Sequence, residues 1–184
     1  VILGSTGGVF EMGRQETIID ERGPNRVDPL IIPRWGPHMS AGRVARELGL
    51  RGPNSSINSA CASATDALGH TFNMIRTGAA DIMLGGGSEA IITPVAVATM
   101  GLMGALSKGY NDAPQKASRP FDLHRDGCVL GEGAGIVVME SLEHARSLRG
   151  PHTVNYALCY LAAVCYIAGD VRAAGERAAE SLEV

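Results

Sequence analysis

The sequence of 184 residues predicts an α/β protein built around a parallel sheet and followed by a helical tail. Short apolar runs end in glycine-rich segments, as buried strands do where they lead into turns. The run 64–75 repeats apolar and small residues at helical spacing, so it predicts a helix with one buried face. Strand-like runs lie on both sides of that helix. The order strand, helix, strand is a βαβ unit, which requires parallel strands.

The first 60 residues predict two short strands separated by an irregular connection and a helix. Apolar residues 1–3 are typical of a buried strand, and the flexible segment 4–8 follows them. Residues 20–37 are polar and rich in proline, which predicts an irregular connection. A helix is expected over 40–48, ended by Gly49. Small alternating residues at 55–59 predict the second strand.

The middle of the chain completes the βαβ unit. After the helix over 64–75, Gly78 is expected to form its C-terminal cap. The apolar run 81–84 predicts a strand that stops at the three glycines 85–87. A further buried strand is expected over 131–139, and a charged helix over 140–149.

The sequence changes character after residue 150, so we divide it into a domain of residues 1–150 and a tail of residues 151–184. The tail predicts helices over 154–168 and 171–182. Their spacing weakly resembles one tetratricopeptide unit, but a single unit cannot bury its own face, which favours two packed helices. The nearly apolar run 156–169 is too short to span a bilayer, so we expect no membrane span.

Composition excludes several classes of function. The formal net charge of −3 and the 4% of aromatic residues argue against a nucleic-acid-binding protein. The four cysteines and five histidines show no metal-ligand spacing, so neither a metal nor a cofactor is expected. No secretory signal is evident, and we interpret the cysteines as reduced thiols of a cytoplasmic protein. The chain starts without methionine inside a strand-like run, which predicts a fragment of a longer protein.

Cys61 is the candidate nucleophile. It lies between the strand expected at 55–59 and the helix expected at 64–75. A helix N-terminus carries unpaired N–H groups and a partial positive charge, which stabilise a thiolate and can hold a developing oxyanion. The small neighbours Ala60, Ala62 and Ser63 leave room for a substrate. Free cysteines are nevertheless often simply buried, so this position alone is moderately specific.

Several motifs, in the same order as in the family, resemble those of β-ketoacyl-ACP synthases over residues 1–150. They are Arg51-Gly52-Pro53-Asn54, Ser59-Ala60-Cys61-Ala62-Ser63-Ala64, Ala80 to Ala90, Ala105-Leu106-Ser107, Ser118-Arg119-Pro120-Phe121-Asp122, Arg125-Asp126-Gly127, Gly131-Glu132-Gly133-Ala134-Gly135 and Glu140 to Ala145. The resemblance is to the elongating class of fatty-acid or type II polyketide synthesis, not to the initiating class primed by acyl-CoA.

This resemblance implies a partial thiolase-like layered fold and decarboxylative Claisen condensation. Cys61 would take an acyl chain from acyl carrier protein as a thioester, and malonyl carried by that protein would then condense with it. The strand at 55–59 would pair with its copy in a homodimer. Leu30, Ile31 and Ile32 would reach toward the partner's acyl pocket, and Arg26 would face the acidic carrier protein.

The sequence also departs from the family. The two histidines that stabilise the enolate lie in motifs that this chain lacks, and His38, His70, His124, His144 and His152 have no matching context. Cys128 stands where relatives usually carry phenylalanine, which leaves space unless neighbours fill it. Gly104 stands where many relatives have a basic residue. We therefore expect the chain alone to accept an acyl group without completing the condensation.

Two alternatives remain open from the sequence. A non-catalytic interaction subunit similar to a chain-length factor would explain a partial domain, but such subunits lack the cysteine. A thiolase or an acyltransferase acting on CoA esters would also use a cysteine thioester. The runs 118–122 and 127–135 favour the synthase over the thiolase or acyltransferase.

Overall fold

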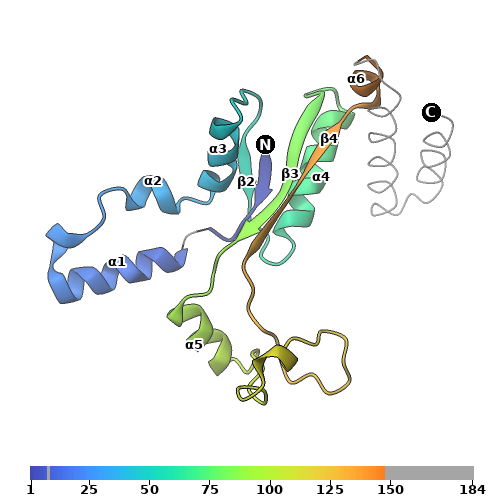
Figure 1. Cartoon of the computed structure of the whole chain (residues 1–184). Coiled ribbons are helices and arrows are strands. Elements are labelled where there is room, and N and C mark those ends of the chain that lie inside the picture. Colours follow the sequence, from blue (N-terminus) through green and yellow to red (C-terminus); the bar gives the residue numbers. More distant parts are fainter. Residues whose placement is uncertain (8, 148–184) are drawn as a thin grey trace. The chain divides into compact units, whose positions relative to one another are not determined.

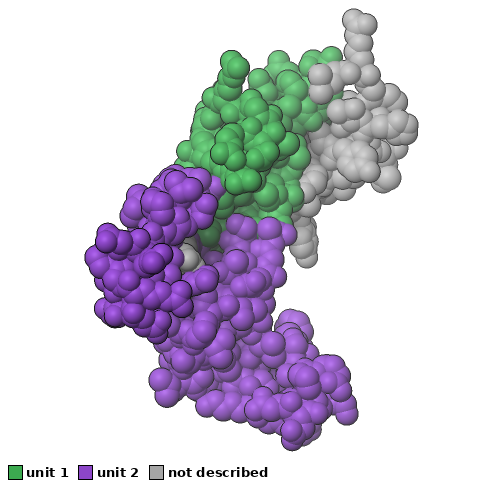
Figure 2. Space-filling view, turned by 60° about the vertical axis from the view of Figure 1, so that its left-hand side comes forward, with its two compact units in different colours: residues 1–5, 40–87, 135–184 green, residues 6–39, 88–134 purple. Residues whose placement is uncertain are grey.

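The computed structural model describes residues 1–7 and 9–147. The chain divides into two compact units, shown in different colours in Figure 2. Unit 1 contains residues 1–5, 40–87 and those from 135 onward; unit 2 contains residues 6–39 and 88–134. The expected helices of the tail 151–184 lie outside the described residues. No helix in the described ranges is long and apolar enough to cross a membrane.

A four-stranded sheet in the order β2-β1-β3-β4 forms the centre of unit 1 (Figure 1). The strands are β1 (Ile2–Gly4), β2 (Ser55–Ile57), β3 (Ile82–Glu89) and β4 (Gly133–Glu140). β1 pairs in parallel with both neighbours, so that Ile2 lies opposite Ser55 on one side and Gly85 on the other. The parallel sheet predicted from the βαβ pattern is confirmed.

β4 runs antiparallel to β3. The Ser141 N–H, just after β4, donates a 2.8 Å hydrogen bond to the carbonyl of Asp81, just before β3. Near the other end of the pair, Gly86 of β3 lies against Gly135 and Ile136 of β4. Residue numbers therefore rise along one strand as they fall along the other, which defines an antiparallel pair.

Two helices cover opposite faces of the sheet in unit 1. α4 (Ser63–Arg76) packs against β1 and β2, and its Ala67 forms a buried cluster with Ile2 and Met83. α3 (His38–Glu47) contributes Ala41 to a second cluster with Val1 and Leu3. Since side chains alternate along a strand, Ile2 faces α4 while its two neighbours face α3. Because a helix packs on each face of the sheet here, all three residues 1–3 are apolar and buried.

The prediction that a strand stops at the glycines 85–87 is wrong, because β3 continues through them to Glu89. These glycines are needed for close approach rather than for a turn. A Cβ at Gly86 would overlap the carbonyl of Gly135 in β4, and a Cβ at Gly87 would lie 2.7 Å from the Cβ of Ala64 in α4. The missing side chains let a strand and a helix approach β3 on different sides.

The helix over 64–75 and its cap are confirmed, and so is the glycine that ends α3. Gly78 and Gly49 have positive φ angles of 72° and 65°, and each donates to a carbonyl in the last turn of its helix. The strand expected at 55–59 ends earlier, at Ile57, where a turn begins. The helix expected over 140–149 is the shorter α6 (Leu142–Ser147).

Unit 2 contains more helix than the sequence predicted. The connection 20–37, expected to be irregular, begins within α1 (Val9–Arg22) and contains the short helices η1 (Pro24–Arg26) and α2 (Ile31–Trp35). α5 (Pro94–Leu102) was also not predicted, and η2 (Pro114–Lys116) follows it. Proline at the first turn of η1, α5 and η2 starts these helices instead of preventing them, since an N–H there has no helical acceptor.

Candidate active site

Cys61 lies in the turn that joins β2 to α4, two residues before the helix begins. Its thiol is free and its residue is exposed. The expected position between a strand and a helix N-terminus is therefore confirmed. A reagent or substrate can reach the sulfur, and the unpaired N–H groups of the first helical turn lie close by in sequence.

Hydrogen bonds from side chains fix the shape of this turn. The buried Ser63 hydroxyl accepts a 2.9 Å hydrogen bond from the Ser59 N–H and donates one of 2.6 Å to the Ala60 carbonyl. The Asn58 side-chain oxygen accepts a 3.1 Å hydrogen bond from the Ala60 N–H. Three polar contacts thus hold the two residues that precede Cys61.

The backbone immediately before Cys61 is strained. Ala60 has a φ of 55°, and apart from glycines it alone has a positive φ in the ranges that the structure covers. A side chain in this left-handed region is uncommon and costs about 1–2 kcal/mol. Such strain persists only where the surroundings enforce it, and here the hydrogen bonds of Ser63 and Asn58 do so.

Gly4 sets how closely α4 approaches the sheet. A Cβ at this position would overlap the Ser63 carbonyl carbon and the Ala64 nitrogen, at the start of the helix. Only glycine fits where β1 meets the helix N-terminus. Sequence reasoning assigned Gly4 to a flexible loop and so missed its role. The available signal was a glycine directly after a buried apolar run.

The turn leaves one backbone donor available beside the thiol. No described residue accepts a hydrogen bond from the Cys61 N–H, while the N–H groups of Ala62 and Ser63 donate to Ser59 and Ala60. An unpaired N–H next to a nucleophile can bind the oxyanion of a tetrahedral intermediate. The arrangement offers a nucleophile and one oxyanion donor.

Neither histidine described in unit 1, His70 or His144, forms a hydrogen bond to Cys61. His70 lies nine residues further along, within α4, so the helical rise alone separates them by roughly 10 Å. His144 lies in α6, where its Nδ1 is 2.5 Å from Glu140 Oε1. His38 and His124 belong to unit 2, and His152 lies outside the described residues.

The other predicted site residues all lie in unit 2. Leu30 and Ile32 are 50% and 64% exposed, whereas Ile31 between them is 7% exposed and packs within the unit. Arg26 is exposed at the end of η1. In the predicted acyl-pocket segment, the side chains of Leu30 and Ile32 are therefore exposed, and that of Ile31 is buried. No group of metal-ligating side chains occurs among the residues described.

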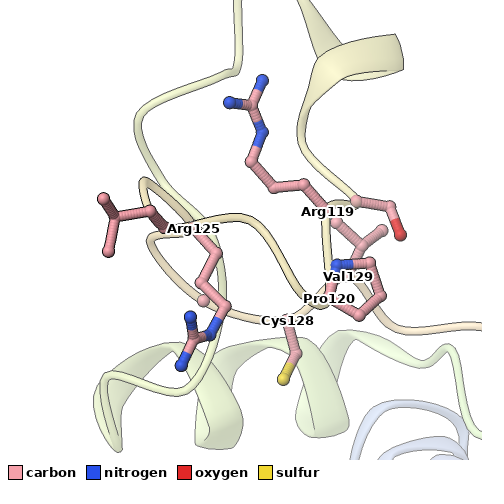
Figure 3. A pocket seen from close by; sticks show the side chains of 8 residues that line it. Arg119, Pro120, Arg125, Cys128 and Val129 are labelled. Carbon is pink, nitrogen blue, oxygen red and sulfur yellow. The ribbon is translucent and has the colours of Figure 1, made fainter.

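Cys128 borders two cavities in unit 2. One, of about 540 Å³, is also lined by Arg119, Arg125 and Val129 (Figure 3). In that view the thiol and the Arg125 guanidinium point to the same side of the ribbon, and Arg119 points away from them. The second cavity, of about 280 Å³, shares Cys128 and Val129. The space expected beside this small side chain is open.

The part of the chain that contains Cys61 is similar to known proteins. Residues 1–145 match the family model described as "Beta-ketoacyl synthase, N-terminal domain". A 3-oxoacyl-[acyl-carrier-protein] synthase 2 from Vibrio cholerae is 47% identical over 150 residues, which cover 80% of this chain and 36% of that protein. The corresponding protein from Rhizobium meliloti is 43% identical over 145 residues, covering 79% and 34%.

Solved structures show the same similarity. A type II polyketide ketosynthase in complex with its acyl-carrier protein matches with a TM-score of 0.70 and 33% identity, over 80% of this chain and 38% of that one. A β-ketoacyl synthase from Burkholderia phymatum matches with a TM-score of 0.69 and 34% identity, over 80% and 36%. The chain spans about a third of the length of these proteins.

Proposed function

This chain belongs to the β-ketoacyl synthase family, and on that premise we propose that it accepts an acyl group on Cys61. One observation carries the proposal: an exposed, free thiol lies on a strained turn at a helix N-terminus, and its own backbone N–H has no hydrogen-bond acceptor among the described residues. Acyl transfer from a thioester needs a nucleophilic sulfur and a donor for the oxyanion. The turn between β2 and α4 supplies both.

In the proposed step, the Cys61 thiolate attacks the thioester carbonyl of an acyl group on acyl carrier protein. The Cys61 N–H stabilises the oxyanion of the tetrahedral intermediate. When the intermediate collapses, the carbon–sulfur bond to the carrier breaks, the carrier thiolate takes up a proton, and the acyl group remains on Cys61. The carrier as donor is supported by the names of the curated relatives and by the ketosynthase structure that contains such a carrier.

For the complete enzyme we propose 3-oxoacyl-[acyl-carrier-protein] synthesis, in which malonyl on the carrier loses CO2 and attacks the acyl thioester. Decarboxylation needs donors for the enolate, and neither histidine described in unit 1 is available to Cys61 for that role. We therefore propose that this chain alone stops at the acylated cysteine.

We further propose that the chain forms a homodimer in the cytoplasm. β2 is a short strand at the sheet edge and begins with two small residues, Ser55 and Ser56, which suits antiparallel pairing with a second copy. Leu30 and Ile32 would then be available to the partner's acyl site, with Arg26 nearer the carrier. Light scattering at micromolar concentration should give twice the chain mass, and a stable monomer would contradict the dimer.

Mass spectrometry after incubation with acyl-ACP tests the acyl-transfer proposal. One acyl group should appear on the wild-type chain and on Cys128→Ser, which removes the other exposed thiol of the described residues, but not on Cys61→Ser. Iodoacetamide should also label Cys61 faster than Cys128, Cys159 or Cys165 at neutral pH. Adduct on Cys61→Ser would contradict the assignment of Cys61. Release of CO2 from malonyl-ACP above background would contradict the proposed stop after acylation.

A further inference from the structure

The cavity of about 540 Å³ in unit 2 is lined by both a thiol and a guanidinium. Cys128 is exposed, and its thiol is free. In Figure 3 the Arg125 guanidinium points to the same side of the ribbon as this thiol. The proposed acyl transfer to Cys61 uses neither residue. The cavity therefore combines a nucleophile and a cation that the proposed function leaves without a role.

No carboxylate neutralises the charge of Arg125 in the part of the chain that the structure describes. Its Nη1 donates a 3.0 Å hydrogen bond to the backbone carbonyl of Asp122, whose carboxylate lies 3.8 Å from Arg119 instead. The Asp126 carboxylate accepts three hydrogen bonds from the loop 107–109. An anion that enters the cavity can therefore pair with Arg125.

Arg119 also lines the cavity, but its guanidinium is engaged elsewhere. Its Cζ lies 4.3 Å from the centroid of the Tyr110 ring, and its Nε donates a 2.7 Å hydrogen bond to the Lys116 carbonyl. In Figure 3 its side chain points away from Cys128. Arg125 is therefore the cation that an anionic ligand would meet beside the thiol.

Space continues on the other side of Cys128. The second cavity, of about 280 Å³, shares Cys128 and Val129 with the first. Apolar side chains, among them Leu106 and Leu130, line much of it. A group attached to the Cys128 sulfur therefore has room on both sides of this residue.

We propose that this cavity is a modification site, at which Cys128 forms a mixed disulfide with an anionic peptide disulfide of the glutathione class. Thiol–disulfide exchange requires an accessible thiol, which Cys128 provides. The carboxylates of the peptide would pair with Arg125, and this pairing would favour an anionic disulfide over a cationic one. The inference does not depend on the chemistry of Cys61.

The exchange transfers one half of the peptide disulfide to the protein. The Cys128 thiol loses its proton to solvent, and the thiolate attacks one sulfur of the disulfide. A new sulfur–sulfur bond forms as the old one breaks, and the second half of the peptide leaves as a thiolate and takes up a proton. Cys128 is thereby oxidised and the departing peptide is reduced, so an excess of the peptide thiol reverses the modification.

Exchange rates with disulfides of opposite charge test the site. The chain is incubated at low salt with glutathione disulfide, which is anionic, or with cystamine, which is cationic, and peptide mass spectrometry follows the adduct on each cysteine over time. Glutathione should attach to Cys128, and added salt should slow this attachment about 2–5-fold without slowing cystamine. A glutathione rate that salt does not lower, or adducts confined to the other three cysteines, would overturn the proposal.

Variants of Arg125 test whether the cavity itself attracts the disulfide. Arg125→Ala should slow attachment of glutathione to Cys128 about 2–5-fold and should not slow cystamine, whereas Arg125→Lys keeps the charge and should retain most of the wild-type rate. Arg22→Ala is the matched control, because Arg22 is an exposed arginine at the end of α1 in the same unit. It should exchange as the wild type does.

Circular dichroism establishes that each variant folds, and the wild-type comparison of the two disulfides stands without any variant. Equal glutathione rates in the wild type and Arg125→Ala would overturn the site. Equal loss in Arg125→Ala and Arg22→Ala would overturn it as well, since the charge of the whole chain would then steer the disulfide. Exchange at Cys128 with no acyl group on Cys61 would overturn the proposed function alone.

Discussion

The Ser63 hydroxyl donates a 2.6 Å hydrogen bond to the Ala60 carbonyl, across the turn that contains Cys61. Ser63 is also the first residue of α4, so one side chain joins the helix to the strained residue before the thiol. A change at this hydroxyl should therefore affect both the stability of the fold and the reactivity of the cysteine.

Ser63→Ala should lower the free energy of unfolding by about 1–3 kcal/mol, because two partly buried hydrogen bonds are lost. It should also slow alkylation of Cys61 by iodoacetamide, since the turn is no longer held. Urea unfolding and timed mass spectrometry measure the two effects. Thr65→Ala, at an exposed residue of the same helix, should change neither. Wild-type labelling rates in Ser63→Ala would show that this hydroxyl does not position the thiol.

Gly86→Ala should destabilise unit 1 by about 3 kcal/mol or more, because the new Cβ would overlap the Gly135 carbonyl at a φ of 155°. Gly69→Ala is the matched control, since Gly69 lies in α4 with open space around it. That helical substitution should stabilise by about 0.5–1 kcal/mol. Denaturant unfolding of both variants checks the opposite signs, and a neutral Gly86→Ala would argue against the close approach of β4.

Lowering the pH should break the hydrogen bonds between the Asp126 carboxylate and the loop at residues 107–109. The pKa of the Asp126 carboxyl is held below its ordinary value of 3.8, first by the hydrogen bond from the Ser107 hydroxyl and then by the N–H groups of Gly109 and Lys108. A lowered pKa in the fold means that these contacts stabilise the loop above pH 3.8. The stabilisation is lost as the pH falls through the lower, folded value.

NMR titration of the Lys108 and Gly109 amides should therefore give a midpoint below 3.8, and Asp126→Asn should remove this titration. A midpoint at or above 3.8 would mean that the carboxylate does not hold the loop.

Charge reversal at Arg26 tests carrier recognition. Arg26→Glu should weaken binding of acyl carrier protein roughly 2–5-fold at low salt, mainly through slower association, because exposed charges each contribute about 0–1 kcal/mol. Arg51→Glu, at another exposed loop arginine, is the control and should bind as the wild type does. Surface plasmon resonance at two salt concentrations measures the difference. Equal affinities for the two variants would make Arg26 an ordinary solvated arginine.

The sequence predicted elements whose signals are local. α4 was located to within one residue at each end because its apolar spacing lies within the helix and its capping glycine, Gly78, follows two residues after its end. Cys61 was likewise found from its position between two predicted elements. α5 was missed because its residues are nearly all apolar and show no helical periodicity. Thr93 followed by Pro94 was the signal available, since the Thr93 hydroxyl caps this helix.

Contacts between distant segments could not be predicted in the same way. The pairing of Gly4 with the start of α4, and of Gly86 with β4, depends on residues far apart in the chain. A glycine that ends a strand and a glycine that admits a neighbouring backbone look alike in the sequence. The backbone strain at Ala60 could not be predicted from the sequence either. Alanine ordinarily avoids a φ of 55°, and here the surrounding hydrogen bonds impose it.

The central place of β1 in the sheet has a consequence for how this protein folds. Ile2 must find Ser55 on one side and Gly85 on the other, so none of its sheet partners is local. Forming these pairs closes long loops before any contact compensates for the lost entropy, which slows folding. During synthesis, the apolar residues Val1, Ile2 and Leu3 leave the ribosome long before β3 does. They remain available to chaperones, or to aggregation, until that strand has been translated.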